Sequence, residues 1–300
     1  MRDSSHRKAF TVALVLLAGT ALPVRASQTW SGGVSATGVY SDKYVVEDGE
    51  DSDSSSLGLR GTLGVEVEQE SSSTRLSASA GYINYRDEAR PDRWTSELEL
   101  RHRRMLTREF WIEFSAQAAA NIATLEYRSA DQVSGRFRVN YEPDDNNRFR
   151  AGFGYRRRAY DDPAGSVADV PFLGAEYRYR RDGRAFEVDV RQEWVNSDFN
   201  TYDYDQTTLS AFYSLPLSSK TSASLGATVR RTQYGSQPAD PLTGDGHRRD
   251  WVVRPEISLT HDFDGPFDLT LDYRHSRRRS NDNAFDRNDD RVALTLAYKF

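Results

Sequence analysis

The chain has 300 residues, a formal net charge of −5 and no cysteine. The lack of cysteine excludes a disulfide scaffold and a thiolate metal site, and the dispersed acids and bases exclude the dominant basic face of a nucleic-acid-binding protein. The mean hydropathy of −0.73 is too polar for a helical membrane protein. It permits a membrane β-barrel, because only alternate residues of such a barrel face lipid.

The first 26 residues have the layout of an export signal. Basic residues precede an apolar run over 9–22, Pro23 ends that run, and Val24 and Ala26 place small side chains before a cleavage site. We therefore predict a cleaved signal peptide over 1–26 and a mature chain over 27–300. The alternative is a transmembrane anchor, but the run is shorter than the ~20 residues that span a bilayer as a helix.

Apolar and polar residues alternate throughout the predicted mature chain. In the last segment, Val292, Leu294, Leu296, Tyr298 and Phe300 share one face, and polar or small residues occupy the other. Because successive side chains of a strand point to opposite faces, each such segment predicts a half-apolar strand. The predicted strands lie near 30–40, 57–68, 75–82, 97–101, 110–118, 136–142, 149–156, 173–180, 186–194, 208–215, 224–230, 251–259, 267–274 and 291–300.

One stripe repeated in every segment predicts an all-β fold. We expect a transmembrane antiparallel up-and-down β-barrel of about 14 strands that forms a single domain over 27–300. A soluble sandwich with one buried face is the alternative, but soluble folds of this size mix more varied patterns. Aromatic residues end many of the stripes, as at the membrane–water interface: Tyr82, Tyr141, Tyr155, Tyr179, Trp194, Tyr273 and Tyr298.

The links between the predicted strands alternate in length. Short turns are expected over 70–73, 106–108, 181–183 and 217–219, and long loops over 41–55, 235–249 and 279–290. Bacterial barrels have short periplasmic turns and longer extracellular loops. The alternation therefore places both chain ends on the periplasmic side and requires an even number of strands.

The last residues resemble the C-terminal signal of bacterial outer-membrane proteins, with Phe300, Tyr298 two residues earlier and an apolar stripe before them. The barrel-assembly machinery reads that signal, so the resemblance implies this machinery as a partner and the outer membrane, with its lipid and lipopolysaccharide, as the location. The chain also resembles the β-barrel porins found beside exopolysaccharide genes, in segment 142–148 and the alternating Tyr and Arg that follow. That resemblance implies an outer-membrane channel for small polar or saccharide-type solutes.

The polar face of the predicted strands would line a charged lumen. Basic residues concentrate between Arg136 and Arg180, while acidic residues lead in the early strands. Such segregation would create a transverse field that orients solutes and biases ion selectivity. In the other reading the charges pair across strands and stiffen the wall. The predicted pore-lining residues are Arg60, Glu66, Arg101, Glu113, Arg136, Arg138, Arg150, Arg156, Glu176, Arg178, Arg180, Glu187, Arg191, Arg254, Asp272 and Arg274.

An enzyme is the second function class, but no catalytic motif emerges. The chain has no Gly-x-Ser-x-Gly and no His-x-x-x-His, and the adjacent His275 and Ser276 would point to opposite faces of a strand. We predict no catalytic residues, no metal and no cofactor. Outside the signal segment the histidines are His102, His247, His261 and His275.

Two charged segments have candidate ligands. The acidic residues 47–53 could bind Ca²⁺, although they lack EF-hand spacing. The run 277–279 of three arginines could contact lipopolysaccharide phosphates. The alternative function is a non-conducting barrel that works with a periplasmic partner in polysaccharide or protein export or in assembly.

Overall fold

The computed structural model describes residues 27–45, 51–86, 92–123, 129–161, 165–198, 203–239, 244 and 246–300. The predicted signal peptide over 1–26 lies outside these ranges. So do residues 47–50 of the acidic segment, for which a Ca²⁺ site was considered. In the described part of the chain, no helix is both long and apolar enough to cross a membrane.

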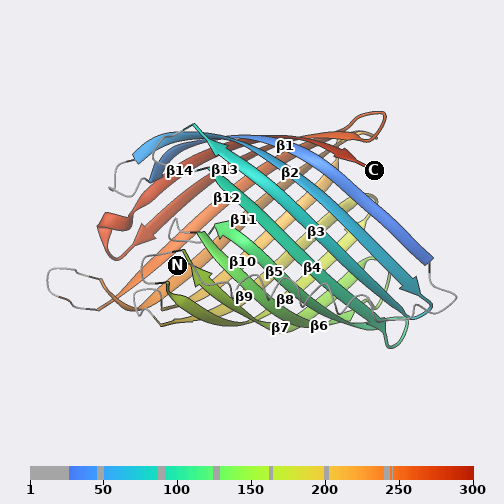
Figure 1. Cartoon of the computed structure of the whole chain (residues 1–300), viewed down its shortest axis with the longest axis horizontal. Coiled ribbons are helices and arrows are strands. Elements are labelled where there is room, and N and C mark those ends of the chain that lie inside the picture. Colours follow the sequence, from blue (N-terminus) through green and yellow to red (C-terminus); the bar gives the residue numbers. More distant parts are fainter. Residues whose placement is uncertain are drawn as a thin grey trace, which may run out of the picture.

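A single antiparallel sheet closes on itself to form a barrel in which every strand pairs with its neighbours in sequence and β14 returns to β1 (Figure 1). The predicted fold class and strand number are confirmed. The strands are β1 (Ser27–Val45), β2 (Asp51–Gln69), β3 (Ser72–Tyr85), β4 (Arg93–Met105), β5 (Phe110–Ala123), β6 (Ser129–Tyr141), β7 (Asn147–Tyr160), β8 (Val167–Arg181), β9 (Arg184–Ser197), β10 (Tyr204–Pro216), β11 (Thr221–Pro238), β12 (His247–Asp262), β13 (Phe267–Ser280) and β14 (Arg287–Lys299), with a short 3₁₀ helix η2 (Asn283–Phe285) before β14.

The strands extend beyond their apolar stripes, so the long loops are shorter than predicted. The expected loop over 41–55 shrinks because Ser41 still pairs with Ser54 and Val45 with Asp51. The expected loop over 235–249 shrinks because β11 continues to residue 238 and β12 begins at 247. Main-chain hydrogen bonds carry the sheet into polar sequence, because the ladder needs no apolar side chains.

Tight turns lie at the end of the barrel where β1 begins and β14 ends (Figure 1). Between β8 and β9, Asp182 and Gly183 both have positive φ, 51° and 75°. This is the type I′ conformation, for which Asp-Gly is well suited because glycine adopts positive φ without steric cost. The predicted turn over 181–183 is confirmed.

The turn between β6 and β7 is organised by a carboxylate. Asp144 Oδ1 accepts hydrogen bonds from the backbone N–H groups of Asn146 and Asn147, each at 2.8 Å. The side chain of Asn147 donates to both carboxylate oxygens. These bonds favour the ionised form and lower the pKa of Asp144, the Asn147 side chain contributing most.

Asp144→Asn is expected to remove a pH-dependent part of the stability. Because the folded-state pKa is below the unfolded one, the carboxylate stabilises the fold at neutral pH and this contribution is lost as the pH falls below about 4. Urea unfolding of the refolded barrel should show a wild-type advantage at pH 7 that shrinks as the pH falls below about 4. An advantage independent of pH would contradict this role.

The seam between β1 and β14 is closed by backbone bonds at its end. Gly32 and Phe300 exchange N–H···O bonds of 2.9 and 3.0 Å. A Cβ on Gly32 would lie 2.6 Å from Cζ of the Phe300 ring, so glycine lets the ring lie close over this strand. Farther along the seam, Thr37 and Thr295 hydroxyls lie 3.0 Å apart.

The outer surface of the barrel is apolar and is bordered by aromatic rings. Large apolar side chains such as Leu59, Phe153 and Leu294 are about half exposed on this face. Near the turn end, Phe110 stacks on Tyr141 with centroids 4.5 Å apart. Near the loop end, Tyr82 packs on Trp94 at 4.7 Å. Two aromatic belts around an apolar band are the outer surface of a transmembrane barrel.

Candidate functional site: the inner wall of the barrel

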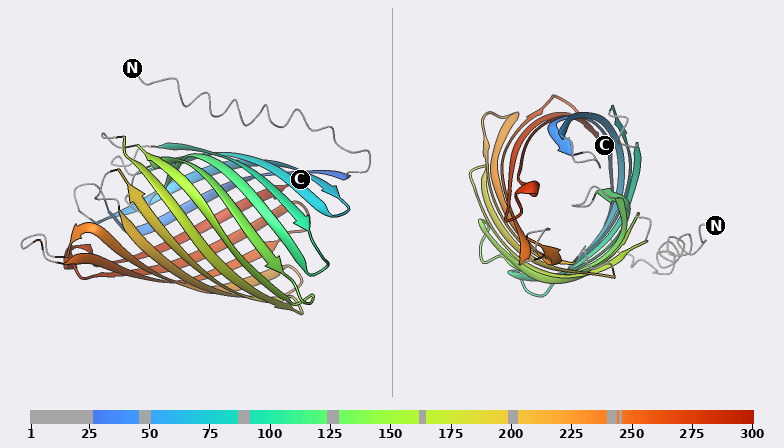
Figure 2. Two further views of the ribbon diagram at one scale, coloured as in Figure 1. Left: turned by 90° about the horizontal axis from the view of Figure 1, so that it is seen from below. Right: turned by 90° about the vertical axis from the view of Figure 1, so that its left-hand side faces the viewer.

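The barrel is a ring when it is seen end-on (Figure 2). Side chains that alternate with the exposed apolar stripe lie on the opposite face of each strand, which is the inner face of this ring. Polar contacts on this face cross from strand to strand: Arg60 reaches Ser79 at 2.7 Å and Glu97 at 3.2 Å, spanning β2 to β4. Polar groups can thus be satisfied inside the barrel while apolar groups face outward.

All sixteen predicted pore-lining residues lie on this inner face. Arg60 and Glu66 are on β2, Arg101 on β4 and Glu113 on β5. The others are on β6 to β9 and on β12 and β13. Placement does not test whether these side chains govern transport, which stays a prediction.

One buried carboxylate joins three strands near the turn end. Glu113 on β5 is 3% exposed and lies 3.5 Å from Arg138 Nε on β6 and 3.9 Å from an Nη of Arg103 on β4. The guanidinium of Arg103 also covers the ring of Trp111 at 3.9 Å. Losing such a carboxylate would leave two positive charges without their partner in a partly desolvated wall.

The next three strands repeat the arrangement with one glutamate for two arginines. Glu176 on β8 contacts Arg148 at 3.0 Å and Arg150 at 3.3 Å, both on β7. Glu193 on β9 pairs with Arg156 and Arg191. The remaining ion pair of this region is Arg178–Glu187, at 3.7 Å. The pairing interpretation of the wall therefore holds for much of β5 to β9.

A glycine makes room for an aromatic platform under these arginines. A Cβ on Gly154 would lie 2.3 Å from Cζ of Phe172, so the Phe172 ring can lie against β7 only because residue 154 is glycine. Arg156 lies 5.0 Å and Arg136 5.9 Å from the centroid of that ring. Cation–π contacts of this kind hold arginines without neutralising their charge.

Several inner arginines have no ion pair within 4.0 Å among the described residues, and five of these are Arg136, Arg230, Arg254, Arg274 and Arg291. The Nε atoms of the first four are buried without a hydrogen-bond partner. Four of the five lie on neighbouring strands β11 to β14, and Arg274 and Arg291 face each other directly in register. Like charges opposite each other destabilise a sheet, so this wall is poised to attract anions.

The charge balance differs around the ring. On β6 to β9 the inner arginines outnumber the inner carboxylates about two to one. The carboxylates are Glu176, Glu187, Asp189 and Glu193. The arginines are Arg136, Arg138, Arg148, Arg150, Arg156, Arg158, Arg178, Arg180 and Arg191.

The predicted lead of acids in the early strands does not hold. Arg93 and Arg103 join the inner face because β4 is longer than its apolar stripe, and they balance the glutamates of β2 to β5. The chain as a whole is anionic, with a net charge of −5. Its inner wall nevertheless carries an excess of positive charge in the described residues.

Apolar residues line the inner wall at the loop end, in parts of the strands that extend beyond the predicted ones. Val170 and Val195 are buried, 0% and 2% exposed, beside Tyr160, Tyr204 and Tyr234. The start of β8 is the signal that could have predicted this cluster, because its residues are apolar on both faces apart from Asp169 and so lack clear alternation. On the strands that carry this cluster, the polar part of the inner wall is therefore confined to the middle and the turn end of the barrel.

Beside this cluster at the loop end, η2 turns into the ring (Figure 2), and the guanidinium of Arg248 lies 4.3 Å from the centroid of the Tyr234 ring. The ring of Phe285 lies 3.3 Å from the guanidinium carbon of Arg248. Arg248 and Arg278 both pair with Asp250, which is 2% exposed. The run of arginines over 277–279 is thus split between the two faces. Because Arg278 points inward, it cannot join a lipopolysaccharide contact on the outer face.

The candidate catalytic residues do not assemble. His275 lies on the outer face with its Nδ1 2.9 Å from Asp290, while Ser276 is buried on the inner face. The rings of His102 and His261 each share a hydrogen bond with a threonine. Within the described ranges no group of three His, Cys, Asp or Glu residues could hold a metal ion.

The closed ring with an apolar outer band and a charged inner wall is the fold of a bacterial outer-membrane β-barrel. Neither a family model nor a curated protein matches the sequence. Among solved structures, the loop L8 deletion mutant of OmpT, an outer-membrane protein of Vibrio cholerae, is similar with a TM-score of 0.57 and 8% identity, over 92% of this chain and 99% of that one.

Two further structures have the same fold, and they belong to proteins with different functions. The anion-selective porin from Comamonas acidovorans has a TM-score of 0.52 and 11% identity, covering 92% of this chain and 100% of its own. A bacterial polysaccharide outer-membrane secretin has a TM-score of 0.54 and 9% identity, covering 90% and 98%. At such identities the likeness shows the fold, and function has to be argued from the wall itself.

Proposed function

We propose that the protein is a passive outer-membrane channel that carries small polar or saccharide-type solutes and prefers anions. The observation that carries this proposal is the excess of inner arginines over inner carboxylates, several of the arginines having no ion pair within the described residues. A charged wall raises the local concentration of counter-ions and so biases what enters. The anion-selective porin among the similar structures fits this reading.

The surroundings of the barrel follow from the same proposal. Outer-membrane lipid would contact the apolar stripe, and lipopolysaccharide phosphates would meet basic residues of the outer face at the loop end, such as Arg277. The barrel-assembly machinery would read the stripe that ends in Tyr298 and Phe300, whose side chains are on the outer face with Phe300 68% exposed.

Planar-bilayer recording of the refolded protein tests the channel. We expect discrete conductance steps and, under a salt gradient, a reversal potential on the anion side, because the wall is cationic. Retarded, heat-modifiable migration on a gel provides the folding control. A folded barrel that never conducts would overturn the channel and favour the alternative of a partner in polysaccharide or protein export or in assembly.

A further inference from the structure

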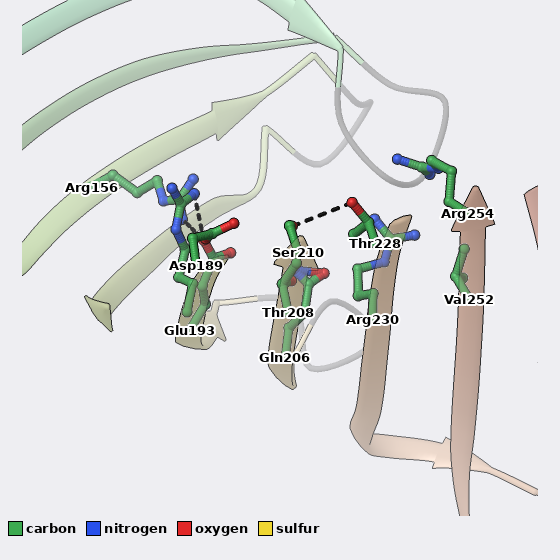
Figure 3. Close-up of a pocket in the computed structure, with 11 residues that line it drawn as sticks. Arg156, Asp189, Glu193, Gln206, Thr208, Ser210, Thr228, Arg230, Val252 and Arg254 are labelled. Atoms are coloured by element: carbon green, nitrogen blue, oxygen red, sulfur yellow. Dashed lines mark hydrogen bonds and ion pairs between the residues drawn. The ribbon is translucent and has the colours of Figure 1, made fainter. Parts of the chain in front are cut away.

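A recess opens in the inner wall between β7 and β12, with a volume of about 330 Å³ (Figure 3). Its floor is neutral and rich in hydrogen-bonding groups. Gln206, Thr208 and Ser210 follow one another along the inner face of β10, and Thr228 on β11 donates to the Ser210 hydroxyl at 3.3 Å. The side-chain oxygen of Gln206 is buried and accepts no hydrogen bond.

The two flanks of this recess differ in charge. On the β7–β9 side, Arg156 and Arg191 share the carboxylate of Glu193, and Asp189 lies beside them. Their charges are therefore largely balanced within the wall.

On the other flank the positive charges are not balanced by ion pairs. Neither Arg230 on β11 nor Arg254 on β12 has a carboxylate within 4.0 Å in the described structure. The Nε of each is buried without a partner. Thr228 faces Arg254 across the strands, and Arg230 follows two residues along the same face, so the two guanidinium groups are diagonal neighbours.

Buried donors and acceptors without a protein partner cost free energy unless water or a ligand completes them, and these lie beside a recess large enough for a small molecule. The unpaired guanidinium groups would bind a carboxylate or phosphate, for which their fork of N–H donors is suited. The Gln206 oxygen and the hydroxyls of the floor would bind the hydroxyl groups of the same molecule.

We infer that this recess is a binding site for a small hydroxylated anion, a sugar acid or sugar phosphate, with its anionic group on Arg230 and Arg254 and its hydroxyls on Gln206 and Thr208. The inference deepens the proposed function, since the site lies in the wall of the same lumen. The volume is at the lower limit of ligand pockets, about 300 Å³, which suits one sugar-sized molecule.

Calorimetric titration of the refolded full chain in detergent micelles tests this site. The probes are glucuronate and glucose 6-phosphate, with glucose as the neutral match and acetate as the anion without hydroxyls. We expect both sugar anions to bind about tenfold more tightly than glucose or acetate, because only they satisfy both halves of the recess. Glucose binding as tightly as glucuronate would overturn the role of the arginines, and equal binding of acetate would overturn the role of the floor.

Matched variants localise the binding. R230Q/R254Q should weaken glucuronate binding about tenfold or more, whereas Arg231→Gln should leave it unchanged because Arg231 is exposed on the outer face beside Trp251. Equal affinities for these two variants would refute the site. The single change Arg254→Gln supplies the same comparison if the double variant fails to refold.

The two proposals fail separately. Conductance without sugar-anion binding would refute the site and leave the channel standing. Binding without conductance would retain the site and refute the channel.

Discussion

The double variant Arg136→Glu, Arg274→Glu is expected to shift selectivity from anions toward cations, lowering the ratio of chloride to potassium permeability about tenfold at 0.1 M salt. Neither arginine has an ion pair within the described residues, so no carboxylate loses its partner. The reversal potential in a planar bilayer measures the change. The effect should be much smaller at 1 M salt, where the screening length is about 3 Å.

The matched control is Arg157→Glu, Arg231→Glu, which makes the same change of charge on the exposed outer face. This variant should leave the reversal potential near the wild-type value. A shift as large as that of the inner variant would mean that total charge, rather than the lumen wall, sets selectivity. Arg138 and Arg178 are poorer probes of selectivity, because each forms an ion pair with a glutamate.

Asp250→Ala is expected to cost about 3–5 kcal/mol in the free energy of unfolding, because it leaves two arginines beside a vacated carboxylate site. Asp250 is 2% exposed and accepts bonds from Arg248 at 2.8 Å and from Arg278 on the neighbouring strand. Urea unfolding of the refolded barrel measures the loss.

An exposed ion pair of the turn end serves as the control. Asp264 pairs with Lys220 and is 86% exposed. Asp264→Ala should therefore lower the free energy of unfolding by less than about 1 kcal/mol. If both variants lost the same stability, burial of the Asp250 carboxylate would not be what stabilises the loop end.

The sequence predicted the sheet well because the lipid-facing and lumen-facing residues of a membrane barrel alternate along each strand with a period of two. The stripe from Val292 to Tyr298 alternates without interruption, and the stripe from Leu57 to Val67 is broken only at Gly61. These stripes are where strands were found. Strand ends were less predictable, since hydrogen bonding continues through polar residues such as Ser52 and Ser54, which no lipid-facing stripe marks.

The inner wall was predicted in position but not in its pairing. Alternation assigns Arg138 and Arg136 alike to the lumen, yet only Arg138 has a glutamate within reach, because register brings Glu113 opposite it. Register depends on turns and bulges throughout the sheet. The docking of Phe285 on Arg248 also lay beyond reach, since it joins segments distant in sequence. The inward cluster around Val170 joins distant segments too, and only the apolar start of β8 gave a sign of it.

The seam between β1 and β14 has a consequence for the order in which the barrel assembles. Its partners, such as Ser35 and Ala297, lie at opposite ends of the described chain, whereas every other ladder joins consecutive strands. Hairpins form in microseconds, while contacts distant in sequence require a long loop to close first. The seam should therefore be the last ladder to form.

Until that ladder forms, the sheet is an open ribbon with two rows of unpaired N–H and C=O groups. In hydrocarbon each such group costs several kcal/mol, and in water such edges recruit other chains. Insertion into the bilayer and closure of the ring must then be nearly simultaneous, or the edges must be held apart by another protein. The rate of biogenesis would be set at this single pair of strands.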